Sequence, residues 1–176
     1  PIGRVLGWIG YVPQQPILFS KTIRDNILFG TKTGSEADLQ RALERASFAK
    51  DIAFLPDGLD TMVGEKGVAL SGGQKQRVSI ARALIGDPEI LMLDDALSAV
   101  DAKTEAEIIE GIRTERRGKT TLITTHRLSA VQHADWIIVL EEGKIVQEGT
   151  HEQLVAQDGW YREQYERQQL EAAIES

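Results

Sequence analysis

Ile90-Leu91-Met92-Leu93-Asp94-Asp95 decides the fold, because four apolar residues run without a break into two acids. A short run that is apolar at every position is typical of a strand covered on both faces, as in a parallel sheet. A helix capped by Asp101 and a further strand over about Thr120–Thr125 are expected next. Alternation of strand and helix predicts an α/β fold, with a mostly parallel sheet covered by helices.

Upstream of this run, the pattern predicts one strand and then a group of helices. The strand is expected over Val5–Val12, which is rich in β-branched and aromatic residues and is followed by Pro13. Three helices are expected after it, each with a serine at its start. They cover about Thr22–Phe29 after Ser20, the segment after Ser35 with Leu39, Leu43 and Ala46 on one face, and the segment from Ser71 to Gly86-Asp87-Pro88.

Downstream, Trp136–Leu140 and Lys144–Gln147 are expected to pair as strands, and about Trp160–Ile174 to form a polar helix. We therefore expect one domain over residues 1–176. It is divided into a helical subdomain at about 14–85, a core portion at 86–157 and a helical tail at 158–176.

Composition narrows the class of protein. The chain has 176 residues, of which 41% are hydrophobic and 27% charged, as in a soluble globular domain. Its net charge is −7 and its Lys and Arg residues are scattered, which argues against a nucleic-acid partner. No cysteine is present, so disulfide and thiolate chemistry are excluded. No apolar run approaches the roughly 18–20 residues that a membrane-spanning helix needs.

Leu70-Ser71-Gly72-Gly73-Gln74 stands at the start of an expected helix. Glycines let the backbone approach a ligand, and the free N–H groups of a first helical turn carry the positive end of the helix dipole. A phosphate is favoured at such a position. An ordinary serine cap followed by flexible glycines remains the alternative.

Polar groups follow the ends of three expected strands, and in open α/β sheets ligands bind beyond those ends. Gln14 follows the first strand, Asp94 and Asp95 the second, and His126 the third. Two adjacent carboxylates at the rim of an apolar strand repel each other unless a cation shares them. Mg²⁺ held by one or two carboxylates and a substrate's phosphates fits this demand, although Asp94 could also serve only as a strand terminator.

A nucleotide site of this kind also needs a phosphate-wrapping loop, with glycine, four residues and then Gly-Lys-Ser or Gly-Lys-Thr. Gly118-Lys119-Thr120 ends like such a loop, but six residues separate it from Gly111 and a strand follows where a helix should. These 176 residues therefore lack the loop. The start at Pro1 also resembles neither a signal peptide nor an initiation site, so a fragment is expected.

Taken together, these motifs resemble the C-terminal two-thirds of the nucleotide-binding domain of an ABC transporter. The resemblance implies a P-loop NTPase-like fold, truncated at its N-terminus, with the signature motif in the helical subdomain. It rests on the signature motif Leu70–Gln74, the Q-loop Val12–Gln14, the Walker B strand Ile90–Asp94, the D-loop Ser98–Asp101 and the switch residue His126. Phe19–Ile27 and Val63–Gly67 resemble the exporter branch.

The family resemblance implies that two such domains close head to tail around two ATP molecules. Ser71, Gly72, Gly73 and Gln74 (the signature turn) would face ATP bound mainly by the partner domain, and Asp101 would bridge the two sites. Asp94 would hold Mg²⁺, Gln14 would sense Mg²⁺ and the transmembrane domains, and His126 would contact the γ-phosphate. The resemblance places this soluble segment at the cytoplasmic face of the cell membrane, in a protein that exports a solute.

Asp95 departs from the family pattern, which places glutamate at this position to orient or activate the attacking water. Aspartate reaches about 1.5 Å less far, and a misplacement of roughly 1 Å can lower a rate on the order of 100-fold. Heterodimeric exporters resemble this arrangement, with one degenerate subunit that completes its partner's active site. We therefore expect this chain to come from the degenerate subunit and to have a different subunit as its partner. The alternative is that aspartate is tolerated at position 95 and the site remains active.

Two other functions remain open. One is a nucleotide-binding module that never hydrolyses ATP in its own site and acts by dimer closure. The other is a soluble relative acting in DNA repair or translation, which the exporter-like segments argue against. As an isolated chain, the protein is expected neither to bind ATP tightly nor to hydrolyse it.

Overall fold

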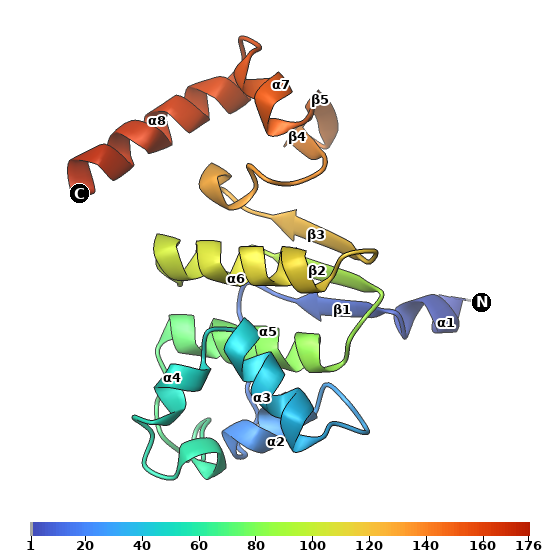
Figure 1. Ribbon diagram of the computed structural model, residues 1–176, viewed down its shortest axis with the longest axis vertical. Helices are drawn as coiled ribbons and strands as arrows, with labels where there is room; N and C mark the ends of the chain where they lie inside the picture. The colour runs from blue at the N-terminus through green and yellow to red at the C-terminus, as the bar shows by residue number, and fades with distance from the viewer. Residues whose placement is uncertain (1) are drawn as a thin grey trace. The chain divides into compact units, whose positions relative to one another are not determined.

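A computed structural model describes residues 2–176, which divide into two compact units. The first extends to Thr124, and the second covers Thr125–Ser176. The first unit is an α/β unit built on a parallel sheet, as expected from the sequence (Figure 1).

The sheet of the first unit has three strands, in the order β1 (Ile9–Val12), β2 (Ile90–Asp94) and β3 (Thr120–Thr124). Both pairings are parallel. Ile90 lies opposite Ile9 on one side and Thr120 on the other. The carboxyl ends of the three strands therefore meet at one edge of the sheet, as predicted.

The first strand is shorter than predicted. The structure has a helix, α1 (Ile2–Leu6), in the first half of the expected Val5–Val12 strand. Pairing of β1 begins where Ile90 N donates to Trp8 O. Pro88 lies in the segment just before β2, and proline has no N–H to donate to a neighbouring strand. Strand-forming residues before Trp8 consequently find no partner there.

The predicted helices of the first unit are present. They are α2 (Ile23–Leu28), α3 (Glu36–Arg45), α5 (Gly72–Ile85) and α6 (Ala102–Glu115), together with the short α4 (Ala49–Ile52) and a 3₁₀ turn at Gly58–Asp60. Ser35 and Asp38 form a capping box at α3, and Asp101 caps α6, as predicted. The cap of α2 is Thr22 and not Ser20, because Thr22 is the residue from which Oγ1 reaches the N–H of Asp25, three positions on.

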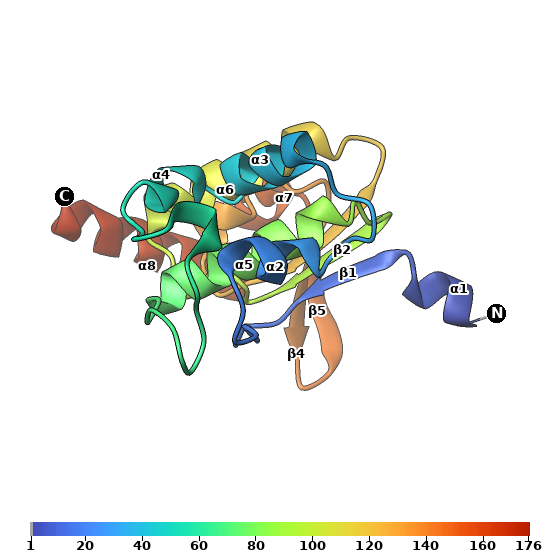
Figure 2. The same ribbon diagram turned by 90° about the horizontal axis from the view of Figure 1, so that it is seen from below.

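Helix α5 occupies the centre of this unit. It contacts β1 on one side and packs against α2 and α3 on the other (Figure 2). Its buried Val78, Ile80 and Ala81 belong to the same core cluster as Leu39 and Leu43 of α3. A single core thus supports both the sheet and the helices, and it fixes the start of α5 relative to the ends of the strands.

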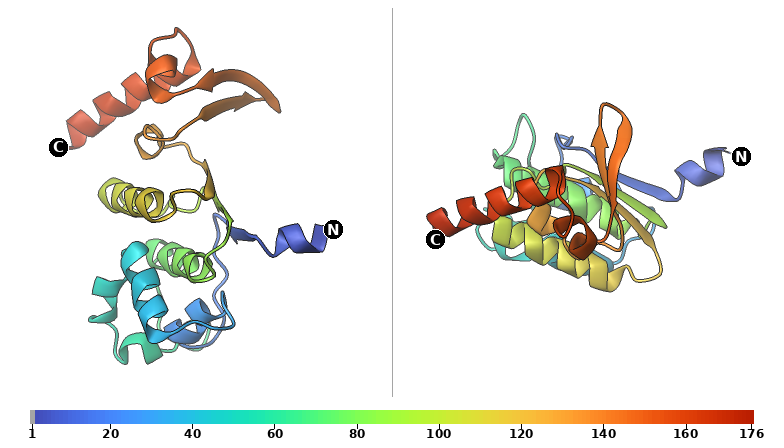
Figure 3. Two further views of the ribbon diagram at one scale, coloured as in Figure 1. Left: turned by 45° about the vertical axis from the view of Figure 1, so that its right-hand side comes forward. Right: turned by 90° about the horizontal axis from the view of Figure 1, so that it is seen from above.

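The second unit contains η2 (Leu128–Ala130), the antiparallel pair β4 (Ile137–Glu141) and β5 (Lys144–Gly149), α7 (His151–Val155) and α8 (Trp160–Glu175) (Figure 3). The strand pair and the final helix confirm the prediction. Glu142 and Gly143 both have positive φ at the turn between the strands, as a tight hairpin requires. Within residues 2–176, no helix combines the length and the apolar character that crossing a bilayer requires.

Candidate functional site

Asp94 lies at the carboxyl end of the central strand and is held by both neighbouring strands. Tyr11 Oη donates to Asp94 Oδ2 at 2.8 Å, and Thr124 Oγ1 donates to Asp94 Oδ1 at 2.8 Å. Each carboxylate oxygen has a second lone pair that these bonds leave available. The carboxylate is therefore oriented and still able to bind a cation.

These hydroxyl donors also favour the ionised form of Asp94. The hydrogen bond from Tyr11, followed by that from Thr124, lowers the pKa of the Asp94 carboxyl below its ordinary value. The same bond raises the pKa of the Tyr11 hydroxyl, because a negative charge beside it disfavours phenolate. Asp94 is consequently ionised at neutral pH, as a ligand for Mg²⁺ must be.

Asp95 adopts a left-handed backbone conformation, with φ of 49°. Its N–H donates to Thr124 O at 3.0 Å and to Thr124 Oγ1 at 3.1 Å. Aspartate is one of the few residues other than glycine that tolerate this region. The two bonds to Thr124 hold the backbone of Asp95 in place, so the length of the side chain limits how far the carboxylate reaches.

The residues present fit a magnesium ion bound together with phosphates, and not a metal enclosed by protein. Among the described residues, no group of three or more His, Asp or Glu side chains gathers in a metal-binding arrangement. Mg²⁺ commonly takes one or two carboxylates and completes its shell with waters and phosphate oxygens. Asp94 meets that requirement, and Gln14, two residues after β1, is exposed at the same edge of the sheet.

The signature turn begins α5 with a complete capping box. Gln74 N donates to Ser71 Oγ at 3.1 Å, and Ser71 N donates to Gln74 Oε1 at 2.9 Å. The capping interpretation of Ser71 is therefore correct. It leaves the phosphate interpretation open, because the N–H groups of Gly72 and Gly73 lie in the first helical turn, where no intrahelical carbonyl is available.

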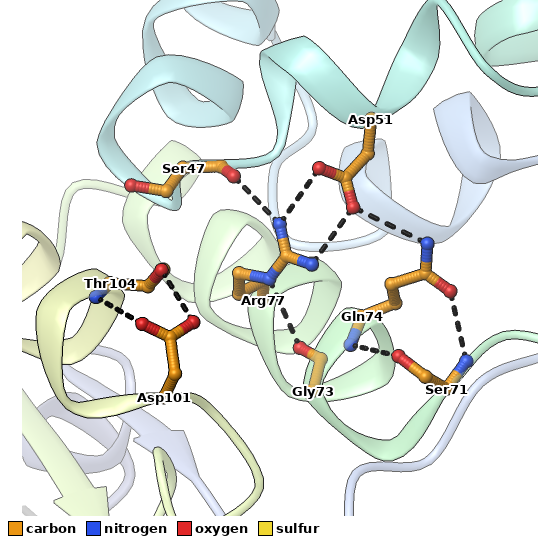
Figure 4. A network of polar contacts seen from close by, with 8 residues as sticks. All are labelled: Ser47, Asp51, Ser71, Gly73, Gln74, Arg77, Asp101 and Thr104. Atoms are coloured by element: carbon orange, nitrogen blue, oxygen red, sulfur yellow. Dashed lines mark hydrogen bonds and ion pairs between the residues drawn. The ribbon is translucent and has the colours of Figure 1, made fainter. Parts of the chain in front are cut away.

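An ion pair between Arg77 and Asp51, which the sequence did not predict, holds the signature turn in place (Figure 4). Arg77 Nη2 lies 2.8 Å from Asp51 Oδ2, and Arg77 Nη1 donates to Asp51 Oδ1 at 3.1 Å and to Ser47 O at 2.7 Å. Arg77 Nε donates to Gly73 O, and Gln74 Nε2 donates to Asp51 Oδ2. The segment around α4 thus holds the turn through one carboxylate and one guanidinium group.

Gly73 also packs closely against the segment after β2. A Cβ at Gly73 would lie 2.8 Å from Ala99 O, whereas a Cβ at Gly72 would lie 3.3 Å from Ala99 Cβ. The first distance is shorter than a carbon–oxygen contact allows, so position 73 requires glycine for close packing.

Asp101 ends the segment that follows β2, and its carboxylate accepts two hydrogen bonds from Thr104 at the start of α6. Its Oδ1 accepts from Thr104 N at 2.9 Å and its Oδ2 from Thr104 Oγ1 at 2.8 Å. The bond from the Thr104 backbone is the main cause that lowers the pKa of Asp101. Asp101 is therefore an exposed, ionised carboxylate whose orientation is fixed.

His126 belongs to the second unit, whereas the other candidate residues belong to the first. Its side chain is exposed, and its carbonyl accepts from Gln168 Nε2 at 2.7 Å. Gln168 Oε1 in turn accepts from Leu128 N. Helix α8 therefore holds the segment of His126, a function of the polar tail that the sequence did not indicate.

The first unit thus brings together Gln14, Asp94 and Asp95 at one edge of the sheet, and the signature turn beside the segment of Asp101. Sequence reasoning missed Tyr11 and Thr124 as partners of Asp94. The only signal available was their position near the ends of strands, since the register that pairs them is a property of the folded sheet.

Comparison with known proteins shows the family to which the chain is similar. The family model described as ABC transporter matches residues 4–98. A probable multidrug resistance ABC transporter ATP-binding/permease protein of Bacillus subtilis is 63% identical over 99% of this chain and 30% of its own length. The multidrug resistance-like ATP-binding protein MdlA of Escherichia coli is 50% identical over 95% of this chain and 28% of its own length.

A solved structure of a bacterial Atm1-family ABC exporter with ATP bound superposes with a TM-score of 0.88 at 43% identity, covering 94% of this chain and 29% of that one. The chain thus spans about 30% of the length of each of these three proteins.

Proposed function

Because the chain belongs to the ABC transporter family, we propose that it is the nucleotide-binding part of an exporter subunit that couples ATP binding and hydrolysis to solute export. The observation that carries this proposal is the position of Asp94, ionised and held by two hydroxyl donors at the edge of the sheet where three strands end. In the proposed site Asp94 holds Mg²⁺, which neutralises charge on the triphosphate. Gln14 and His126 complete the site in the longer protein.

The signature turn is proposed to act on a second ATP molecule. Ser71, Gly72, Gly73 and Gln74 face ATP held mainly by another ABC nucleotide-binding domain, and Asp101 bridges the two sites. The free N–H groups of the first turn of α5 support this, because they favour a negatively charged ligand. The phosphate-wrapping loop, which these 176 residues lack, is expected elsewhere in the longer protein.

The remaining partners follow from the same premise. The Bacillus subtilis relative is named an ATP-binding/permease protein, so we propose transmembrane domains of the same polypeptide or complex as partners. The segment is then placed at the cytoplasmic face of the membrane, with a different subunit supplying the second nucleotide-binding domain.

We propose further that the chain's own ATP site is degenerate at Asp95. The two hydrogen bonds from Asp95 N to Thr124 keep the backbone from moving forward to make up for the missing methylene. Turnover would then occur mainly in the partner's site, which this chain completes with its intact signature turn.

The test is the ATP turnover of the full-length transporter with its partner subunit. Asp95→Glu should raise turnover, by as much as about 100-fold at this site if reach is limiting. Replacing Ser71 with alanine should damage the partner's site more than the chain's own. Unchanged turnover in Asp95→Glu would remove the reach argument, and equal damage to both sites would contradict the division of labour.

A second candidate function is a regulatory subunit that binds ATP and never hydrolyses it, favoured by Asp95 alone. In that case Asp95→Glu leaves turnover unchanged, while ATP still drives association of the two nucleotide-binding domains.

A further inference from the structure

Gln76 is a buried polar side chain that the site described above does not use. It lies on α5, is 3% exposed, and belongs to the first unit with all of its partners. Its Nε2 donates to Gln14 O at 2.9 Å and to Ser98 Oγ at 3.0 Å. Its Oε1 accepts from Ala99 N at 2.9 Å. One amide group thus uses both donors and its acceptor on two loops that are far from it in sequence.

Each of the three segments that meet at Gln76 carries candidate site residues. Helix α5 begins with the signature turn, the segment after β1 contains Gln14, and the segment after β2 leads from Ser98 to Asp101. Ala99 is held at both ends of its backbone, because its N–H donates to Gln76 while its carbonyl packs against Gly73. The three segments are therefore joined through the Gln76 amide and through the packing of Ala99 O against Gly73.

We propose that Gln76 is a positioning residue that makes the Gln14 segment, the Ser98–Asp101 segment and the signature turn move as one body. This inference rests on the proposed function, in which Gln14 serves the chain's own ATP site while the signature turn serves the partner's. Gln76 touches neither ATP molecule. It links the two ATP sites within one chain, so that a shift of Gln14 at the chain's own site is transmitted to the signature turn at the partner's site.

Two substitutions separate the bonds that Gln76 makes. Gln76→Met keeps the length of the side chain and removes every hydrogen bond, which leaves Gln14 O and Ala99 N without their partner. Gln76→Glu keeps an acceptor for Ala99 N and removes the donor to Gln14 O. The matched control is Gln40→Met on α3, because the Gln40 side chain is exposed and bonds only to Glu44 among the described residues.

The first measurement is steady-state ATP hydrolysis by the full-length transporter with its partner. Both Gln76 variants should lower kcat by about tenfold, as expected for a small misplacement of catalytic groups, with KM for ATP changed less than about threefold. Ser98→Ala should lower kcat in the parent protein and add nothing in the Gln76→Met background, because both changes break one network. A residue that only stabilised the fold would lower Tm without this pattern.

The second measurement is hydrogen–deuterium exchange, which does not depend on turnover. Exchange of the peptide that contains Ala99 should accelerate about tenfold in Gln76→Met and stay at the parent rate in Gln76→Glu and Gln40→Met. Parent-like exchange at Ala99 in Gln76→Met overturns the inference, as does parent-like kcat in a hydrolysing transporter. A parent transporter that neither binds nor hydrolyses ATP overturns the proposed function instead, and with it the link between sites.

Discussion

Tyr11 Oη donates a 2.8 Å hydrogen bond to Asp94 Oδ2 across two adjacent parallel strands. Tyr11 lies directly opposite Met92 in the register, and Asp94 follows Met92 by two residues on the same face of the sheet. The tyrosine therefore reaches its acceptor along the diagonal, a distance that a long aromatic side chain can span. Only the register of β1 against β2 brings these two residues together.

Tyr11→Phe should raise the pKa of Asp94, because it removes the largest cause of the lowered value. A carboxyl group whose pKa is lowered on folding stabilises the protein at pH above its unfolded value, and this contribution is lost as the pH falls through the folded value. The variant should therefore be less stable than the parent at neutral pH, with the difference shrinking on acidification below about pH 4.

A ¹³C NMR titration of the carboxyl groups measures this pKa directly, and thermal unfolding as a function of pH measures the linked stability. Tyr165→Phe, in the second unit, is the control and should leave the titration of Asp94 unchanged. Identical titration curves for Tyr11→Phe and the parent would show that the hydrogen bond has no influence on the charge of Asp94.

Thr124 supports two acidic residues at once, since Oγ1 donates to Asp94 Oδ1 and accepts from Asp95 N. Thr124→Val keeps the β-branched shape and removes both bonds, so the free energy of unfolding should fall by about 1 kcal/mol. Thr124→Ser keeps the hydroxyl and should remain close to the parent. Urea unfolding of the two variants tests this, and a loss in Thr124→Ser with none in Thr124→Val would mean that the methyl group, and not the hydroxyl, stabilises this edge of the sheet.

The parts of the fold that depend on neighbouring residues could be predicted from the sequence. The apolar run of β2, the Ser35–Asp38 capping signal and the stop at Gly86-Asp87-Pro88 each specify their element locally, and all three appear as expected. The start of β1 could not be predicted in this way, because it depends on where Pro88 ends the pairing of a distant strand.

The residues of the candidate site likewise fall into those that the sequence indicates and those that only the folded structure reveals. Asp94, Gln14 and the signature turn stand out by residue type and position. By contrast, the contacts of Asp51 with Arg77 and of Gln76 with Gln14 and Ala99 join residues that are distant in sequence. Periodicity and composition do not contain such pairings, so these supporting residues became visible only in the folded chain.

The ion pair between Arg77 and Asp51 should be important for stability, since its side chains are only 13% and 14% exposed. Asp51→Ala leaves a largely buried guanidinium group without its carboxylate, and we expect the free energy of unfolding to fall by about 3 kcal/mol. Asp158→Ala breaks an ion pair with Arg162 in which the aspartate is fully exposed, and it should have little effect. The Arg77 guanidinium also lies over the Phe48 ring, 5.3 Å from its centroid. Denaturant unfolding compares the two variants, and similar small losses would show that Ser47 O, Gly73 O and this ring suffice to hold Arg77.

Gly73→Ala should destabilise the first unit although alanine is the better helix former. The added Cβ would meet the backbone atom Ala99 O at 2.8 Å, and a Cβ has no side-chain torsion by which it could rotate away. Overpacking of this kind costs about 1–3 kcal/mol, against a gain of about 1 kcal/mol from helix propensity. Gly72→Ala is the matched control, because its Cβ would meet only the methyl group of Ala99 at 3.3 Å. Thermal unfolding should therefore give a lower Tm for Gly73→Ala than for Gly72→Ala. The reverse order would mean that the segment of Ala99 moves away easily, and that the signature turn is not fixed by its contact with that segment.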